Sequence, residues 1–241
     1  MSDGRGDHDR AGDAAGQVLI PDLLTGMATT RAIRRYTAEP VGDHDLATIL
    51  WHASRAPSGS NRQPFRFVVL RDGERAVAAK ALLGTAFRRA WTWKSRTDGF
   101  DEVDPSSARG RAASAMQHFV DHLEEVPVVV LACLVRYRAP APTEGGSVYP
   151  ACQNLLLAAR ALGYGGALTM WHLMVEAELR ELLAIPEDVA MSACITLGRP
   201  QGHHGPVRRA PLSNLVYDDV WDEPASWALD PPGTPTTRPL R

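Results

Sequence analysis

The stretch "SVYPACQNLLLAARALGYGGALTM", residues 147–170, decides the fold. Its first part, residues 147–162, is apolar nearly all round, which predicts a helix that is buried on most sides. Gly163 stands where a helix C-cap glycine is expected, and "GYGGALTM" then predicts a turn and a short strand. A Rossmann glycine loop follows a strand and opens a helix, whereas this one follows a helix and opens a strand. The order therefore argues against a dinucleotide-binding Rossmann fold.

The segments on either side mix helices with a few strands. Phe65–Leu70, 126–135 and 191–198 predict strands, and the apolar run at 126–135 predicts a buried one. Apolar spacing predicts helices over 43–55, 74–95, 104–124 and about 175–183, with Asp43 and Asp104 as N-caps. Few buried strands among many helices predict an α+β fold, in which helices wrap a small central sheet.

Bulk composition narrows the function classes. The chain has 241 residues, of which 44% are hydrophobic and 22% charged, as in ordinary globular proteins. Its formal net charge of −2 gives no basic character, so we expect no nucleic-acid partner. No run of about 18 apolar residues occurs, so we expect no membrane span. Cys133, Cys152 and Cys194 form no Cys-x-x-Cys pair, which argues against a zinc or dithiol site and favours buried thiols in a cytoplasmic protein.

Both ends of the chain differ from the centre. Residues 1–17 are charged and Gly-rich and lack the apolar centre of a signal peptide, which predicts a disordered N-terminal tail. Residues 225–241 predict a Pro-rich C-terminal tail. One domain is expected between them, over residues 18–224.

A second informative stretch is "APSGSNRQPFRFVVL", residues 56–70. Small and polar residues crowd together directly before a core strand. One interpretation is a simple turn, because Gly, Ser, Asn and Pro favour turns for backbone reasons. The other is a loop whose amides and short side chains hold a polar ligand.

Two arginine clusters lie near opposite ends of the chain, in "TRAIRRY" (30–36) and "GPVRRAPL" (205–212). Each is either a solvated basic patch or an anion clamp, since guanidinium forks match phosphate oxygens. The two arginine clusters, the small-polar loop and the glycine-rich strand together indicate a ligand-binding function more specifically than any one of them alone. The pair His118 and His122 in "HFVDH" has helical i, i+4 spacing but no third ligand, so exposed helix histidines are favoured and no metal site is expected.

Taken together, these segments resemble the nitroreductase family of FMN-dependent, homodimeric oxidoreductases. The resemblance rests on "TRAIRRYTAEPV", "APSGSNRQPFRFVVL", the stretch 147–170, "LRELLAIPEDVAMSACITLGRP" and "VRRAPLSNLVYDDVW". It runs in order from about residue 22 to 221. It implies a nitroreductase-like α+β fold with a central, mostly antiparallel sheet wrapped by helices, in a dimer.

The resemblance also implies a set of FMN-binding residues. The opening motif would supply Arg31, Ala32, Arg34 and Arg35 to the ribityl phosphate and ring edge, and the C-terminal clamp would supply Arg208 and Arg209. The ring would contact Pro57, Ser58 and Gly59, with Asn61 and Gln63 from the partner subunit or the dimer seam, and Leu168, Thr169 and Met170 near flavin N5. Two positions depart from the family: Thr30-Arg31-Ala32 replaces the usual Arg-Arg-Ser, and Met170 replaces a hydroxyl or acidic residue.

The implied activity is a ping-pong transfer of electrons from NAD(P)H through FMN to a small acceptor such as a nitroaromatic, quinone or enone. Flavin carries the chemistry, so no catalytic side chain is assigned. One alternative is a relative that uses reduced FMN for dehalogenation or for oxygen-dependent breakdown of the flavin. Another is a non-catalytic flavin-binding protein.

The segment "FRRAWTWKSRTDGF", residues 87–100, pairs Trp91 and Trp93 with basic side chains next to a polar loop. As a mobile lid over the flavin, it would select the acceptor, because indoles stack on flat aromatics and cations attract anionic groups. The other interpretation is that both tryptophans pack on the domain surface at the end of an ordinary helix.

Overall fold

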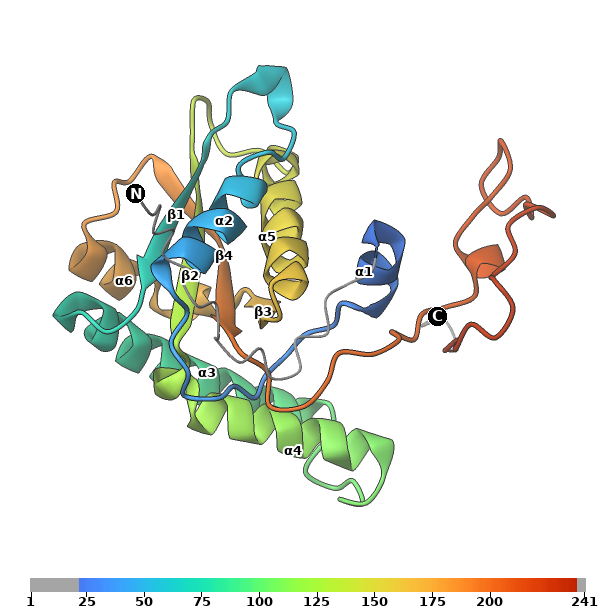
Figure 1. The fold of residues 1–241 in the computed structure, drawn as a ribbon, viewed down its shortest axis with the longest axis horizontal. Helices are drawn as coiled ribbons and strands as arrows, with labels where there is room; N and C mark the ends of the chain where they lie inside the picture. The colour runs from blue at the N-terminus through green and yellow to red at the C-terminus, as the bar shows by residue number, and fades with distance from the viewer. Residues whose placement is uncertain (1–21, 238–241) are drawn as a thin grey trace, which may run out of the picture.

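The computed structural model describes residues 22–237, so the predicted tail at 1–17 lies outside the described residues. The elements, in chain order, are α1 (Leu23–Thr29), α2 (Asp43–Ala53), β1 (Phe65–Leu70), α3 (Glu74–Thr97), α4 (Ala108–Asp121), β2 (Val128–Val135), α5 (Tyr149–Ala161), β3 (Gly165–Thr169), α6 (Glu176–Leu183) and β4 (Val189–Gly198) (Figure 1). Short 3-10 turns lie at Gly59–Asn61, Leu123–Glu125, Glu144–Ser147, Trp171–Val175 and Leu212–Asn214. None of the helices within residues 22–237 has the length and apolarity needed to cross a membrane.

The four strands form one sheet in the order β1-β2-β4-β3, and every neighbouring pair is antiparallel. Phe65 lies opposite Leu134 at one end of the sheet, and Gly165 lies opposite Gly198 at the other. The predicted α+β architecture with an antiparallel sheet is confirmed.

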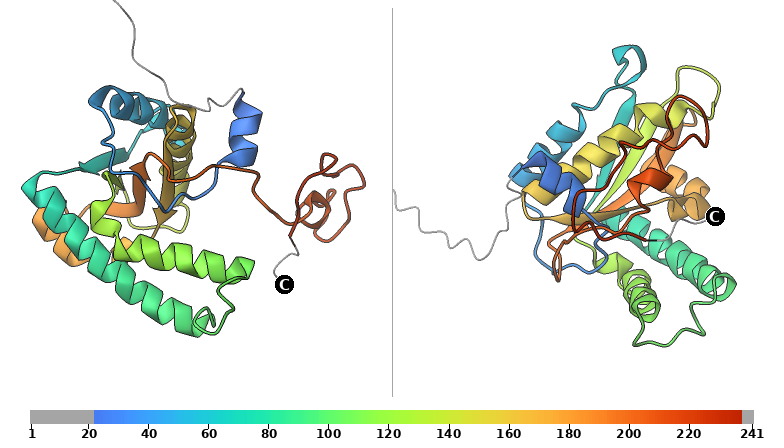
Figure 2. Two further views of the ribbon diagram at one scale, coloured as in Figure 1. Left: turned by 60° about the horizontal axis from the view of Figure 1, so that its bottom comes forward. Right: turned by 90° about the vertical axis from the view of Figure 1, so that its right-hand side faces the viewer.

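Helices cover both faces of the sheet (Figure 2). On β2, Val130 and Ala132 belong to the core with α2 and α5, whereas Val129 and Leu131 belong to the core with α3, α4 and α6. Because both faces are buried, β2 carries apolar residues at every position instead of alternating.

Helix α5 is buried on one side. Ala151, Cys152, Leu155 and Ala159 are inaccessible and pack toward α2 and the sheet. Leu157 is only half-buried and Tyr149 is exposed. A single chain therefore does not give α5 the burial on most sides that its apolar sequence predicts.

Two predicted helix caps are wrong. Gly42 is the N-cap of α2, and Asp43 is its first helical residue. Helix α4 begins at Ala108, where the Oγ of Ser107 accepts a hydrogen bond from the Gly110 amide at 2.9 Å. Asp104 instead accepts from the Ser106 amide at 2.9 Å, so its carboxylate closes a turn before the helix.

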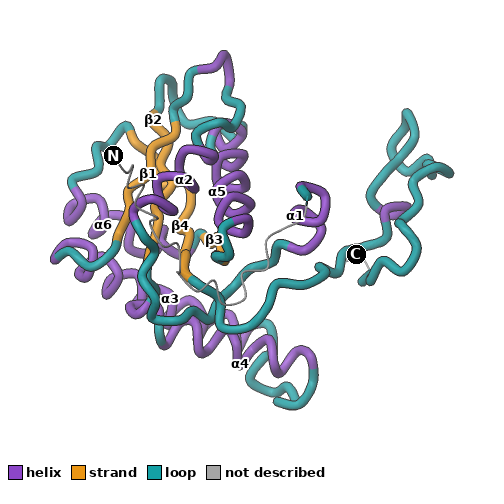
Figure 3. Tube along the Cα trace, viewed as in Figure 1, coloured by secondary structure: helices purple, strands orange, loops and turns teal. Residues whose placement is uncertain are grey.

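The chain leaves the body after β4 as an arm, defined here as residues 205–237, which runs mostly as irregular coil (Figures 1 and 3). The arm folds back on itself: Tyr217 bridges Pro224, and the Thr237 amide donates to the Arg209 carbonyl at 2.7 Å. Ala225 and Ala228 are buried. Residues 225–237 thus pack with the preceding part of the arm, and the predicted domain boundary after residue 224 stays a prediction.

Candidate functional site

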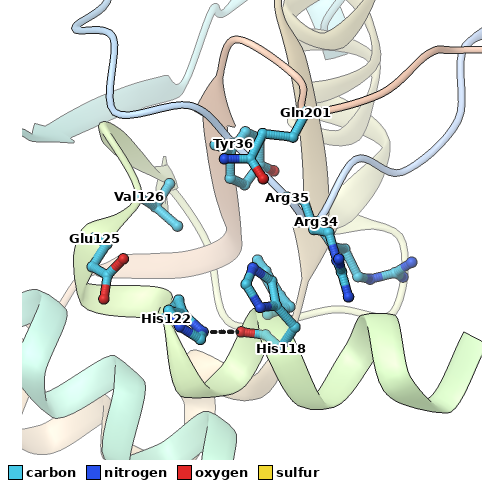
Figure 4. Close-up of a pocket in the computed structure, with 9 residues that line it drawn as sticks. Arg34, Arg35, Tyr36, His118, His122, Glu125, Val126 and Gln201 are labelled. Carbon is cyan, nitrogen blue, oxygen red and sulfur yellow. Dashed lines mark hydrogen bonds between the residues drawn. The ribbon is translucent and has the colours of Figure 1, made fainter.

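A cavity of about 100 Å³ lies between α4 and the segment that follows α1. It is lined by Arg34, Arg35, Tyr36, His118, Phe119, His122, Glu125, Val126 and Gln201. Figure 4 shows His118 near the end of α4 and His122 directly after it, with the segment that carries Arg34, Arg35 and Tyr36 across the cavity from them. Two residues of the predicted cofactor motif therefore share one cavity with the histidine pair.

The arginine segment is held against the end of the β3–β4 pair. The Ile33 amide donates to the Gly166 carbonyl at 2.9 Å, and Tyr36 forms a bridge with Pro200. The Tyr36 hydroxyl donates to the Ile33 carbonyl and lies 2.8 Å from the Thr196 hydroxyl. Burial raises the pKa of Tyr36, so the phenol stays neutral at ordinary pH. With Ile33 buried and Tyr36 half-buried, the intervening Arg34 and Arg35 are left exposed.

The sequence predicts exposed helix histidines at His118 and His122, whereas the structure places both in the cavity lining. The two rings stack with centroids 4.1 Å apart, and Nδ1 of His122 donates to the His118 carbonyl at 2.8 Å. Desolvation lowers the pKa of His118, and the nearby His122 and Arg35 lower it further. Glu125 is the carboxylate in the cavity lining. The available signal was the i, i+4 spacing in "HFVDH"; within residues 22–237 no group of three metal-ligating side chains is present.

The arginines predicted to bind the cofactor carry no internal counter-ion. Within the described part of the chain, ion pairs engage Arg71, Arg88, Lys94, Arg136, Arg180 and Arg199. None of them engages Arg31, Arg34, Arg35, Arg208 or Arg209. Desolvation lowers the pKa of Arg34, and the charge of Arg31 adds to this effect. Their guanidinium groups are therefore available to an external anion, as are those of other exposed arginines such as Arg75 and Arg89.

Strand β3 brings the glycine-rich turn against the arginine segment. A Cβ on Gly165 would lie 2.5 Å from Cγ1 of Ile33, and one on Gly166 would lie 2.6 Å from the Thr196 carbonyl oxygen. Gly165 therefore allows the segment at 31–36 to approach the sheet closely, whereas Gly166 allows β3 to pack closely against β4 and α5. At the other end of β3, Leu168 is exposed, and Thr169 and Met170 are half-buried. The Thr169 hydroxyl accepts from the Trp171 amide at 3.3 Å.

The loop at 57–63 lies elsewhere. It leads into Phe65 at the Leu134 end of the sheet, whereas Ile33 contacts Gly166 near the opposite end. Figure 1 shows the loop and the arginine segment at opposite ends of the body. Within the loop, Ser60, Asn61 and Gln63 all have φ near +50°, and the Gly59 amide donates to the Ser147 Oγ at 3.2 Å. One chain thus does not bring the predicted ring-contacting loop to the predicted arginines.

The predicted lid needs a correction at Trp91. Helix α3 continues to Thr97, and Trp91 is only 5% exposed, with its Nε1 donating to Gln117 Oε1 at 2.8 Å. Its ring packs beside Phe100, with centroids 5.5 Å apart. A core indole cannot act in a mobile lid, so the lid hypothesis is left with Trp93, which is 70% exposed.

The fold and these features define an α+β protein with arginine side chains gathered at one edge of the sheet. The chain belongs to the nitroreductase family, whose family model matches residues 27–199. A curated NADH dehydrogenase of Thermus thermophilus is 30% identical over 209 residues, which cover 82% of this chain and 96% of the relative. A 5,6-dimethylbenzimidazole synthase of Rhodospirillum rubrum is 28% identical over 178 residues, covering 72% of this chain and 80% of the relative. The crystal structure of a Desulfovibrio desulfuricans protein in complex with FMN superposes with a TM-score of 0.60 at 28% identity, covering 82% and 96% of the two chains.

Proposed function

We propose that this chain is an FMN-dependent oxidoreductase that moves electrons from NAD(P)H to a small acceptor, with nitroaromatics and quinones as the acceptor classes to test. The observation that carries the proposal is the match to the nitroreductase family over residues 27–199, with Arg34 and Arg35 of the cofactor motif lining one cavity. The relatives named for NADH oxidation and for an FMN complex support the same assignment.

The donors present fit a flavin mononucleotide. Arg31, Arg208 and Arg209 supply guanidinium forks for its phosphate, and the cavity at Arg34 and Arg35 supplies cationic donors for the polar edge of its ring. When bound, FMN supplies the redox chemistry, alternating between NAD(P)H and the acceptor in a ping-pong cycle. The protein's own part is to bind and orient the flavin and to surround it with positive charge, which favours reduction.

We further propose that the working unit is a homodimer. The loop at 57–63 and the arginine segment lie at opposite ends of one chain, so a second copy is required to bring them together. The chain also exposes large apolar side chains at Leu23, Leu24, Met27, Leu215, Val220, Trp221, Trp227 and Leu229 on α1 and the arm. Exposed apolar surface of this kind marks an interface. Location in the cytoplasm stays a prediction from the sequence.

The direct test begins with the purified protein. Mass spectrometry of cofactor released by heat should find FMN, and anaerobic NADPH or NADH should bleach the flavin absorbance. Replacing Arg209 with Ala should weaken FMN binding about ten- to a hundredfold, because a charged hydrogen bond contributes about 1.5–3 kcal/mol. Arg75→Ala, at an exposed position on α3, is the matched control. Recovery of FAD, or no flavin after reconstitution, would contradict the proposal, and flavin that NAD(P)H does not reduce would favour a non-catalytic binder.

A second candidate follows from the similarity to 5,6-dimethylbenzimidazole synthase. Dimethylbenzimidazole contains the dimethyl-substituted benzene ring that flavins also carry, so the flavin would be the substrate. Exposing the protein with reduced flavin to oxygen distinguishes the two candidate functions. Stoichiometric loss of flavin with a dimethylbenzimidazole product supports the second candidate, whereas repeated turnover of NAD(P)H with intact flavin supports the first.

A further inference from the structure

A second cationic cluster lies behind the glycine-rich turn, outside the cavity described above. Arg160 comes from the last turn of α5, His204 from the segment that follows β4, and Arg31 from the segment that follows α1. Nε2 of His204 would lie 3.2 Å from a Cβ on Gly165, so the absence of a side chain there lets the imidazole approach the strand. Three segments far apart in the sequence thus bring two guanidinium groups and an imidazole together.

The cluster holds two buried side-chain nitrogens that have no hydrogen-bond partner in the described part of the chain. The Nε of Arg160 and the Nδ1 of His204 are both buried, and neither has a hydrogen-bond partner among the described residues. Polar atoms in such positions are rare, because leaving them unpaired costs about 1–3 kcal/mol each. Two of them in one cluster indicate that a group from outside the described residues completes it.

The charge around His204 indicates the sign of that group. Burial lowers the pKa of His204, and the positive charges of Arg160 and Arg31 lower it further. The carboxylates around Tyr164 already have partners. Glu39 forms an ion pair with Arg199, and Asp45 accepts a hydrogen bond from the Tyr164 hydroxyl at 2.7 Å. No carboxylate in residues 22–237 pairs with Arg31, Arg160 or His204, and the two uncompensated guanidinium groups favour an anion as the missing group.

We propose that Arg160 and His204 join Arg31 in binding the phosphate of the flavin, and that His204 takes up a proton as the phosphate binds. The proposal rests on the function proposed above and names residues that the family resemblance did not. It also addresses Thr30, which stands where the family carries an arginine: Arg160 supplies a guanidinium from another element.

The tautomer of His204 explains the proton uptake. Nε2 lies 3.3 Å from the Tyr164 carbonyl, which only accepts, so Nε2 carries the hydrogen in the neutral ring. Nδ1 is then an acceptor and repels a phosphate oxygen. Protonation turns Nδ1 into a donor, and the bound phosphate in turn stabilises the imidazolium. FMN should therefore bind more tightly as the pH falls toward the pKa of free His204.

Comparing FMN with riboflavin isolates the phosphate. The holoprotein is diluted and released FMN is followed by fluorescence, while riboflavin affinity is obtained by exchange. Arg160→Met should weaken FMN about tenfold or more and leave riboflavin within about twofold, as expected for one charged hydrogen bond. Arg75→Met is the matched control. Equal losses for both flavins, or no loss for FMN, overturn the inference alone, whereas a wild-type chain that binds neither flavin overturns the proposed function.

A pH series tests the role of His204 separately. This test remains valid even if the Arg160→Met variant does not fold. Between pH 8 and 6.5 the phosphate stays mostly dianionic, since its second pKa is about 6. Over this range the FMN-to-riboflavin affinity ratio should rise as the pH falls, and His204→Asn should flatten the rise. His44→Asn, on the exposed side of α2, should keep it. A ratio independent of pH in the wild type overturns the proton uptake.

Discussion

Trp91 and Trp93 stand two positions apart in α3, and this spacing points their indoles to different sides of the helix. Trp91 packs among Phe87, Phe100 and Phe119 in the core shared with α4, while Trp93 faces solvent. Trp91 therefore contributes to the core, whereas Trp93 is free for another role.

We expect Trp91→Ala to lower the free energy of unfolding by about 3–5 kcal/mol, because it empties a core site and removes the hydrogen bond to Gln117. Trp93→Ala should change it by less than about 0.5 kcal/mol. Urea unfolding of both variants measures this difference. If Trp93 covers the flavin, its variant alone should change kcat/KM for acceptors per bound flavin; unchanged constants would end the lid hypothesis.

At the scale of elements, helix α6 ends under avoidable strain. Ala184 follows Leu183 in the left-handed conformation, with φ of 52° and ψ of 44°. Glycine is favoured at this position because a Cβ makes the left-handed conformation costly. The Ile185 amide donates to the Arg180 carbonyl at 3.0 Å, so the end of the helix is bonded in the way that the motif requires.

Ala184→Gly should raise the free energy of unfolding by about 0.5–1 kcal/mol, since it relieves this strain. Ala47→Gly, at an exposed position inside α2, should lower it by about the same amount. Chemical denaturation of the two variants provides the check. A loss of stability in Ala184→Gly would show that backbone entropy outweighs the strain.

The same scale shows what the sequence predicts well. The sequence predicts strand β1 at its observed bounds, because a turn closes each end of an apolar run. The cap of α4 was misassigned because Asp104 and Ser107 both precede the helix, and only their contacts with Ser106 and Gly110 separate them. The residues of the candidate site also differ in how well the sequence predicts them. Arg34 and Arg35 belong to one contiguous motif and can be predicted from it. His118 and His204 cannot, because the residues around them come from segments distant in the chain.

For the molecule as a whole, the arm stands apart from the folded body. Both hydrophobic cores are built from residues between 36 and 197. The arm instead exposes Leu215, Val220, Trp221, Trp227 and Leu229, and Trp221 is 80% exposed. The body does not depend on the arm for its cores, and the arm leaves these large apolar side chains exposed.

Truncation after residue 210, which keeps Arg208 and Arg209, should therefore leave the body folded and convert a dimer to a monomer. Light scattering measures the mass, and circular dichroism reports the fold. Full-length protein that scatters as a monomer with flavin bound would contradict the proposed dimer. Dimer interfaces of the obligate type bury more than about 2,000 Å², so the transition should be complete at micromolar concentrations.

The separation of the 57–63 loop from the arginine segment has a genetic consequence. In a shared site, a lesion in the loop and a lesion at Arg31 damage opposite halves of each pocket. When two such defective chains are coexpressed, each mixed pair holds one doubly damaged pocket and one intact pocket. Random assortment then restores about one quarter of the wild-type pockets, because half of the pairs are mixed. Two inactive alleles of this gene would complement each other.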